Sequence, residues 1–139
     1  MAFVLDCSIT LTWFFEDEDN PYAMLVLDSL AETEAVVPVI WTLEVPNGLL
    51  TAERRGRLTA DKANQAIELL KKLSIRVDVL ENGMQPLLAL ARDCKLTTYD
   101  AAYLELAKRC QLPLATSDQA LAKAARLSNV QLADFHPTP

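Results

Sequence analysis

The stretch AFVLD, residues 2–6, is a short apolar run that ends on an acid. A similar run, LPLATSD at residues 112–118, also ends on an acid, and three more apolar runs occupy residues 35–40, 75–79 and 130–132. Continuous apolar runs of this length are typical of buried strands in parallel sheets. Longer stretches with helical spacing separate them. This alternation predicts an α/β domain with a mostly parallel, five-stranded sheet flanked by helices.

Periodicity and capping signals predict the helices between these strands. Two of them cover residues 21–30 and 59–73, and another begins near Thr42. A fourth is capped by Asn82 and continues to about Cys94, with Pro86 near its start, as the first turn tolerates. The last two cover residues 99–110 and 118–127. We expect these helices to cover the sheet.

Size and composition fit one globular domain over residues 1–132, followed by a tail at residues 133–139. The chain has 139 residues, of which 51% are hydrophobic and 23% charged. A disordered chain would lack the apolar surface to offset its ordering entropy. No basic, signal-like segment precedes Asp6, and no apolar run approaches the roughly 20 residues of a membrane span. We therefore expect a cytoplasmic protein that does not bind a membrane.

The histidine and cysteine content excludes several kinds of catalytic site. His136 is the one histidine and lies in the proline-containing tail, so neither a Ser-His-Asp triad nor a two-histidine ribonuclease mechanism is predicted. The three cysteines are widely spaced, without the pattern of a zinc site. Cys7 follows an acid, which disfavours its thiolate, and we interpret it as a small buried hydrophobe.

Four acids are expected to meet at one edge of the sheet. Asp6 and Asp118 each end a strand and precede a helix, so both lie at the carboxyl ends of parallel strands, where such sheets bind ligands. Glu44 lies in the first turn of the helix after the second strand. Asp100 begins the helix that follows LTT at residues 96–98. The alternative for each acid is a helix cap or a charge stabilised by the helix dipole.

Clustered carboxylates indicate a bound cation. Carboxylates within about 4 to 6 Å raise each other's pKa unless a cation compensates their charge. Oxygen ligands and the absence of histidine favour Mg²⁺ or Mn²⁺ over zinc. Such a site is suited to phosphodiester hydrolysis, because the metal activates a water and neutralises the leaving oxygen.

Four motifs carry a resemblance to a known family. They are VLDCS at residues 4–8, WTLEVPN at 41–47 followed by ERRGR at 53–57, LTTYDAAY at 96–103 and LATSD at 114–118. In this order they resemble the PIN-domain ribonucleases, specifically toxins of the VapC type, over nearly the whole chain.

The resemblance implies a three-layer PIN-like fold and a metal-dependent endoribonuclease. Asp6, Glu44, Asp100 and Asp118 would be the catalytic, metal-binding acids, with Ser8, Asn47 and Thr116 as polar neighbours. It further implies Mg²⁺ or Mn²⁺ as cofactor, an RNA substrate (tRNA, rRNA or mRNA), a homodimer and a cognate antitoxin. The alternative is a PIN scaffold without catalysis that holds a protein partner.

Charge and one proline bear on this interpretation. The net charge of −6 requires local basic residues to contact phosphate, and Arg54 and Arg55 are our candidates, with Arg57 nearby. Lys108 and Arg109 are better explained as partners of a helix dipole. Pro46 departs from a helix-favouring pattern, so it either lies within the first turns of the helix or displaces Glu44 and Asn47.

An aromatic block and the residue at position 8 also bear on function. Of the aromatic block at residues 13–15, at least one ring is a candidate for a dimer or antitoxin groove. A haloacid-dehalogenase-like phosphatase would need an acid at position 8, where this chain has Ser8, and a response-regulator receiver would need paired acids and a suitably placed lysine that we do not find.

Overall fold

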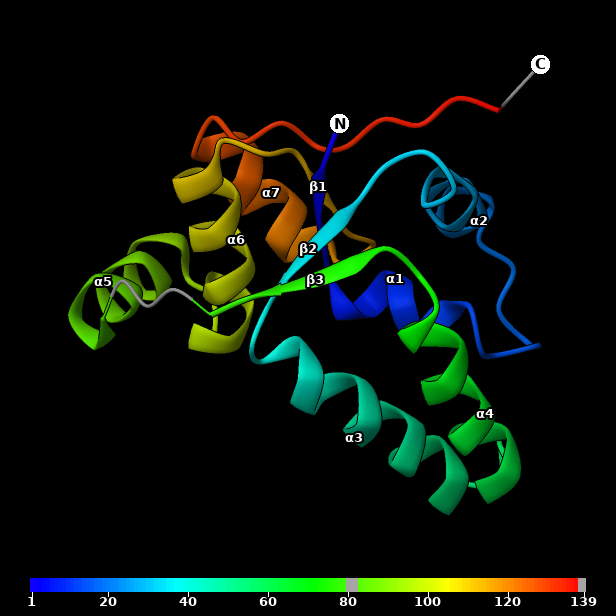
Figure 1. Cartoon of the computed structure of the whole chain (residues 1–139). Coiled ribbons are helices and arrows are strands. Elements are labelled where there is room, and N and C mark those ends of the chain that lie inside the picture. The colour runs from blue at the N-terminus through cyan, green and yellow to red at the C-terminus, as the bar shows by residue number, and fades with distance from the viewer. Residues whose placement is uncertain (80–82, 138–139) are drawn as a thin grey trace.

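The computed structural model describes residues 1–79 and 83–137, and its centre is a parallel sheet of four strands. The strands are β1 (Phe3–Leu5), β2 (Ala35–Pro38), β3 (Ile75–Asp78) and β4 (Leu114–Ala115). Their order is β3-β2-β1-β4, so the first strand in the chain lies in the middle (Figure 1). β1, β2 and β4 are buried along their whole length, as the continuous apolar runs predicted.

Seven helices among the described residues cover the two faces of the sheet. They are α1 (Cys7–Thr12), α2 (Pro21–Ser29), α3 (Trp41–Arg54), α4 (Ala60–Lys71), α5 (Met84–Cys94), α6 (Thr98–Cys110) and α7 (Gln119–Leu127). In Figure 1, α5, α6 and α7 lie on one side of the strands and α1, α2 and α4 on the other. The predicted α/β sandwich is therefore confirmed. No helix in the described ranges is long and apolar enough to cross a membrane.

The strand order places a topological switch point between β1 and β4. From β1 the chain moves outward to β2 and β3, and then it crosses back to β4 on the far side of β1. Right-handed crossovers put the helices after β1 and after β4 on opposite faces. Ligands of open parallel sheets bind at such a switch point, outside the carboxyl ends of the strands. Asp6 follows β1 there, and Asp118 lies just beyond β4.

The predicted fifth strand was wrong. Residues 130–132 make an isolated bridge, in which Leu132 lies parallel to Leu114. Two backbone hydrogen bonds support it, from the Leu114 amide to the Gln131 carbonyl at 2.9 Å and from the Ala133 amide to the Leu114 carbonyl at 2.8 Å. Because β4 is itself two residues long, it offers little edge for a longer partner.

The helices begin and end within two residues of most predicted limits. Helix α3 begins at Trp41 and continues through Pro46, so Glu44 keeps its place in the first turn. The structure gives Gly48 a reason: a Cβ atom there would lie 2.4 Å from Cδ1 of Leu11, so glycine lets α1 approach α3 closely. The predicted cap Asn82 lies outside the described residues, and Gly83 is the N-cap of α5.

The segment after residue 132 contacts the core. The ring of Phe135 packs edge-on against Phe3, with centroids 5.0 Å apart. The Tyr22 hydroxyl donates to the Ala133 carbonyl at 2.6 Å. A domain boundary at residue 132 stays a prediction, and these contacts fix the start of the predicted tail against the sheet.

Candidate active site

Asp6 is a buried carboxylate held by two hydroxyl groups. Its side chain begins directly after β1 and is 5% exposed. Ser8 Oγ and Thr116 Oγ1 both donate to Asp6 Oδ2, each at 2.7 Å. Although Asp6 occupies the N-cap position of α1, its side chain makes no capping hydrogen bond. The alternative of a simple helix cap therefore does not explain Asp6.

Asp118 is connected to the same hydroxyl groups through the backbone of its loop. The Asp118 amide donates to Thr116 Oγ1 at 3.0 Å, and the Ser117 amide donates to Ser8 Oγ at 3.1 Å. Asp118 is also the N-cap of α7, where its Oδ1 accepts from the Leu121 amide at 2.9 Å. Its cap role is real and leaves the carboxylate beside Asp6. Ser8 and Thr116 thus lie where the resemblance implied.

Glu44 is oriented by a tyrosine on another helix, α6. Helix α3 carries it in its first turn, half-buried, and the Tyr103 hydroxyl donates to Glu44 Oε1 at 2.7 Å. The start of α3 is fixed by Trp41, whose Nε1 donates to Thr10 Oγ1 at 3.0 Å in the core. Asn47 lies one turn further on the same helix with an exposed side chain.

Asp100 lies in the first turn of α6. Thr97 caps this helix by accepting from the Asp100 amide at 3.1 Å, so the Asp100 carboxylate is not needed as the cap. A carboxylate in a first turn is stabilised by the helix dipole. Among the four acids, Asp100 is the one without a preceding strand, since α5 comes before it in the chain.

The four carboxylates lie close enough to repel one another. Burial raises the pKa of Asp6, and the Asp118 charge raises it further against the two hydroxyl donors. Burial also raises the pKa of Glu44 and of Asp100, with Asp6 contributing to both shifts. Asp100 additionally repels Glu44 and is repelled by Asp118. The structure therefore brings all four predicted acids to one place.

In the part of the chain that the structure describes, no basic side chain pairs with these acids. Within residues 1–79 and 83–137, none of the ion pairs involves Asp6, Glu44, Asp100 or Asp118. Burial raises the pKa of the neighbouring Cys7 thiol, and the Glu44 and Asp6 charges add to this shift. Apart from this thiol, the site consists of carboxylate oxygens, which are hard donors.

This donor set fits Mg²⁺ or Mn²⁺ in kind. In the described part of the chain, no three carboxylate, histidine or cysteine side chains already surround one point as ligands would. Mg²⁺ usually keeps several waters and uses one or two protein carboxylates directly. Two strand-end aspartates, with Glu44 and Asp100 facing them, satisfy that requirement.

Comparison with known proteins agrees with this geometry. Residues 3–127 match the PIN domain. This chain belongs to the PIN-domain family. Ribonuclease VapC3 of Mycobacterium tuberculosis is 37% identical over 97 residues, which cover 68% of each chain.

Two solved structures share the PIN fold. PAE2754 from Pyrobaculum aerophilum superposes with a TM-score of 0.68 at 21% identity, covering 89% of this chain and 84% of that one. A toxin-antitoxin complex from Klebsiella pneumoniae gives 0.61 at 18% identity, covering 88% and 89%. At these identities the likeness concerns the fold alone.

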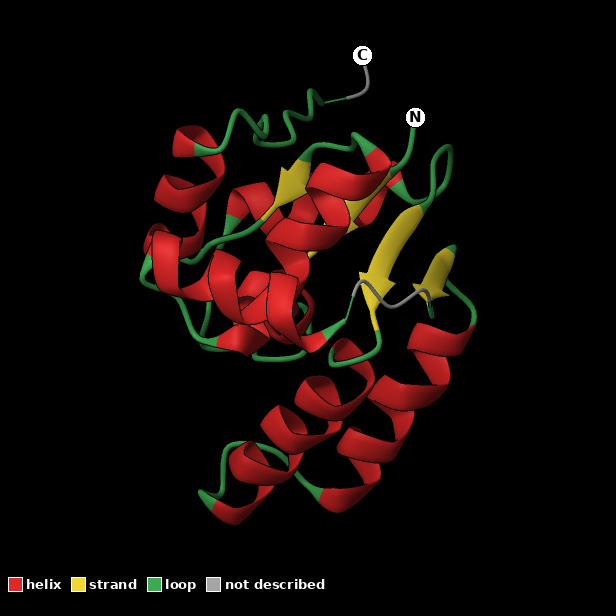
Figure 2. Cartoon of the chain, turned by 90° about the vertical axis from the view of Figure 1, so that its left-hand side faces the viewer, coloured by secondary structure: helices red, strands yellow, loops and turns green. Residues whose placement is uncertain are grey.

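The predicted basic residues of this PIN domain lie away from the acids. Arg54 and Arg55 are exposed at the last turn of α3, and Figure 2 shows the α3–α4 pair extending away from the sheet. Ten residues of helix separate Arg54 from Glu44, which is about 15 Å along the axis. Arg57 is engaged elsewhere, since it pairs with Asp17 at 3.0 Å and lies over the Phe15 ring at 4.4 Å.

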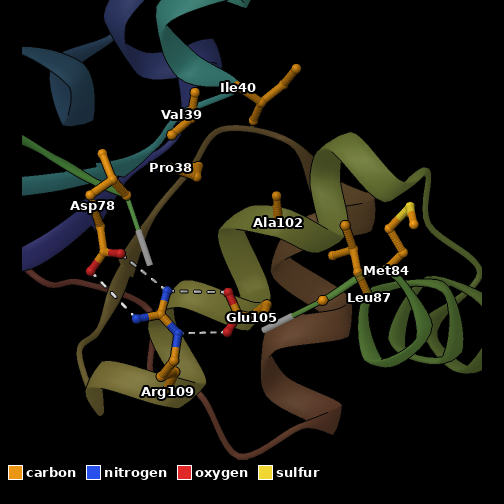
Figure 3. A pocket seen from close by; sticks show the side chains of 11 residues that line it. Pro38, Val39, Ile40, Asp78, Met84, Leu87, Ala102, Glu105 and Arg109 are labelled. Atoms are coloured by element: carbon orange, nitrogen blue, oxygen red, sulfur yellow. Dashed lines mark hydrogen bonds and ion pairs between the residues drawn. The ribbon is translucent and has the colours of Figure 1, made fainter. Parts of the chain in front are cut away.

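A pocket of about 550 Å³ lies at the same edge of the sheet, beyond β2 and β3 (Figure 3). Its polar part is an ion cluster. Arg109 Nε pairs with Glu105 at 2.7 Å, and Arg109 Nη2 pairs with Asp78 at 3.4 Å. Arg109 thus neutralises two carboxylates, in addition to lying in the last turn of α6 as the dipole explanation predicted.

The aromatic block after α1 is mainly part of the packing. Trp13 and Phe14 pack against the core, and Trp13 Nε1 donates to the Ala23 carbonyl at 2.8 Å. A role for any of the three rings in a dimer or antitoxin groove stays a prediction.

Sequence reasoning missed Tyr103 as part of the site. The signal was present, because Tyr103 follows Asp100 by three positions and so shares its face of a helix. Buried tyrosine is usually interpreted as packing, and nothing in the sequence indicates that its hydroxyl meets Glu44 across 59 positions. It also missed Asn20, which caps α2 and donates to Ser117 Oγ at 3.0 Å.

Proposed function

We propose that this PIN domain is a metal-dependent endoribonuclease and the toxin of a toxin-antitoxin pair. The observation that carries the proposal is the convergence of four carboxylates at the switch point of the sheet, with no basic partner among residues 1–79 and 83–137. Such a cluster is costly unless a cation joins it. Relatives named ribonuclease VapC3 make RNA the substrate of choice.

The four acids would hold Mg²⁺ or Mn²⁺ and align it with the scissile phosphate. When bound, the ion supplies an acidified water and charge neutralisation at the leaving oxygen. Ser8 and Thr116 keep Asp6 in one orientation by donating to a single oxygen, Oδ2. The backbone amides of Ser117 and Asp118 fix these two hydroxyls in turn, so the loop after β4 shapes the metal site. Asn47, one turn along α3 from Glu44 and exposed, would be a further polar neighbour of the site.

The substrate and partners follow from the same interpretation. RNA, as tRNA, rRNA or mRNA, would reach the acids from the open edge of the sheet. A cognate antitoxin would be the protein partner, in keeping with the toxin-antitoxin complex from Klebsiella pneumoniae that shares this fold. We also expect a homodimer. The three unpaired cysteines are in keeping with a reducing, cytoplasmic setting.

The test is cleavage of RNA by the purified protein. We expect cleavage with Mg²⁺ or Mn²⁺, none with excess EDTA, and recovery when Mn²⁺ is restored. Asp6→Asn and Asp118→Asn remove one negative charge each from the site and should lower the rate by more than about 100-fold, beyond the loss typical of residues that only support metal ligands. A labelled RNA resolved on a denaturing gel measures the rate.

Two controls separate this activity from contamination and from a binding module. Asp93→Asn changes an exposed acid on α5 and should leave the rate unchanged. Equal cleavage by wild type, Asp6→Asn and Asp118→Asn would contradict the proposal. A folded protein that binds an antitoxin but neither Mn²⁺ nor RNA would identify the binding-module alternative.

A further inference from the structure

Tyr103 is a buried tyrosine whose hydroxyl contacts one of the four acids, Glu44. Its side chain is fully buried on α6, and its hydroxyl donates to Glu44 Oε1 on α3 at 2.7 Å. A buried phenol without a hydrogen-bond partner is costly, so this bond fixes both groups. The two residues are 59 positions apart, and the bond connects α6 with α3.

The hydrogen bond between Tyr103 and Glu44 has one possible direction. A phenol O–H donates, and in the structure the Tyr103 hydroxyl donates to Glu44 Oε1 at 2.7 Å. A glutamate carboxylate is an acceptor, so the pairing cannot reverse while Glu44 is ionised.

Neighbouring contacts also restrain the two helices that carry Tyr103 and Glu44. Asp100 precedes Tyr103 by one turn of α6, so one helix face supplies a carboxylate and the group that orients a second one. On the other side, the bond from Trp41 to Thr10 fixes the first residue of α3 in the core. Glu44 is thus restrained through its backbone and through one carboxylate oxygen.

We propose that Tyr103 is a positioning residue of the metal site: its hydroxyl holds Glu44 Oε1, so that Glu44 presents Oε2 to the cation. The inference rests on the proposed function, since it assigns Glu44 to the metal site. It implies that Glu44 is a one-oxygen ligand. It also implies that the geometry of the site depends on a residue that touches neither RNA nor metal.

The test is direct binding of Mn²⁺ to the RNA-free protein by titration calorimetry. Tyr103→Phe removes the hydroxyl and keeps the ring, so we expect the dissociation constant for Mn²⁺ to rise about tenfold, within the 10- to 100-fold typical of groups that orient a ligand. Tyr22→Phe is the matched control. It also removes a tyrosine hydroxyl that donates at 2.6 Å, but to the Ala133 carbonyl, and it should leave Mn²⁺ affinity unchanged.

A second background separates positioning from packing. In Glu44→Gln protein, adding Tyr103→Phe should change the Mn²⁺ dissociation constant by less than about twofold, because the group it orients no longer carries charge. A tenfold loss in both backgrounds would assign Tyr103 a packing role and overturn the inference. So would a Tyr103→Phe protein that is unfolded at the assay temperature.

The outcome also distinguishes this inference from the proposed function. Wild-type protein that binds Mn²⁺ and cleaves RNA, with equal Mn²⁺ affinity in Tyr103→Phe, would overturn the role of Tyr103 alone. Wild-type protein that neither binds Mn²⁺ nor cleaves RNA would overturn the proposed function and this role with it.

Discussion

Two groups of acids lie at the carboxyl edge of the same sheet, and they are neutralised in different ways. Beyond β3, Asp78 and Glu105 share the guanidinium of Arg109. Beyond β1 and β4, the four acids of the site receive hydroxyl and amide donors, and no ion pair in the described ranges includes them. The first group carries its own cation, whereas the second group lacks one.

The difference separates a structural cluster from a functional one. A buried carboxylate can be stabilised by a permanent cation, as in the Arg109 cluster, and such a site has nothing left to bind. Hydroxyl donors orient a carboxylate but leave its charge in place. The raised pKa of Asp6, Glu44 and Asp100 follows from this, with burial as the largest cause for each. Acids with a raised pKa at the ligand-binding edge of a parallel sheet are candidates for function.

The largest expected effect on stability comes from the Arg109 cluster. Arg109→Met keeps much of the side chain's bulk and removes the charge shared by Asp78 and Glu105, whose side chains are 8% and 18% exposed. We expect the free energy of unfolding to fall by about 3 kcal/mol, as for other broken buried pairs. Urea denaturation measures it.

The control for Arg109 is a surface pair. Arg76 pairs with Glu34 at 3.1 Å, with side chains 55% and 43% exposed, so Arg76→Met should cost less than about 1 kcal/mol. Mn²⁺ affinity of folded Arg109→Met should match wild type. If the two variants lost equal stability, the Arg109 cluster would not be the structural element that the comparison requires.

The next largest effect is expected on how the stability of the protein depends on pH and on bound metal. Because the pKa of Asp6, Glu44 and Asp100 is raised in the folded protein, the fold binds more protons than the unfolded chain above pH ~4. The metal-free protein should therefore lose stability as pH rises from ~4 through the folded pKa values, and this loss should be complete above them. Mn²⁺ reverses the loss where the acids are ionised.

Differential scanning fluorimetry at pH 5 and pH 7.5 measures this coupling. At a concentration of 100 times its dissociation constant at pH 7.5, Mn²⁺ should add about 2.7 kcal/mol at that pH, and the same concentration should add less at pH 5, because protons compete with the metal for the acids. Asp6→Asn should reduce the difference between the two pH values. A Mn²⁺ effect that is equal at both pH values would indicate binding elsewhere.

The sheet and the acids were predictable from sequence because they depend on local patterns. One apolar run ends at Asp6 and another ends after Ala115, and these positions identify the ends of two strands. Parallel strands align their ends at one edge of the sheet. The prediction of a fifth strand at residues 130–132 was wrong because that strand would have to pair with β4, which is only two residues long. Pro46 could not be judged from sequence, since the Trp41 to Thr10 bond that fixes the start of α3 joins distant segments.

The roles of the basic residues were harder to predict than those of the acids. Arg54, Arg55, Arg57 and Arg109 look alike in sequence, but Arg57 and Arg109 are paired with acids from 31 to 40 positions away. Tyr103 was missed for the same reason. A side chain's chemistry can be read locally, whereas its partner depends on the tertiary fold.

The smallest effect is expected at the far end of α3. It concerns Arg54 and Arg55, in contrast to Arg57 and Arg109, which are paired with acids. Arg54 and Arg55 are exposed, about 15 Å along the helix from Glu44, so they would contact RNA away from the scissile phosphate. In the Arg54→Gln, Arg55→Gln double variant we expect KM to rise and kcat to hold. The slope of log affinity against log salt should fall by about 0.7 for each lost phosphate contact.

Arg126→Gln is the matched control for this last prediction, because Arg126 is exposed in the last turn of α7, at the end opposite Asp118. RNA affinity measured by fluorescence anisotropy at several salt concentrations should not respond to it. A fall in kcat in the double variant would mean that RNA contacts at the end of α3 also position the scissile phosphate at the acids. An unchanged salt slope would mean that the RNA approaches from the α6 side, where Lys108 is the exposed cation nearest to the engaged Arg109 along the chain.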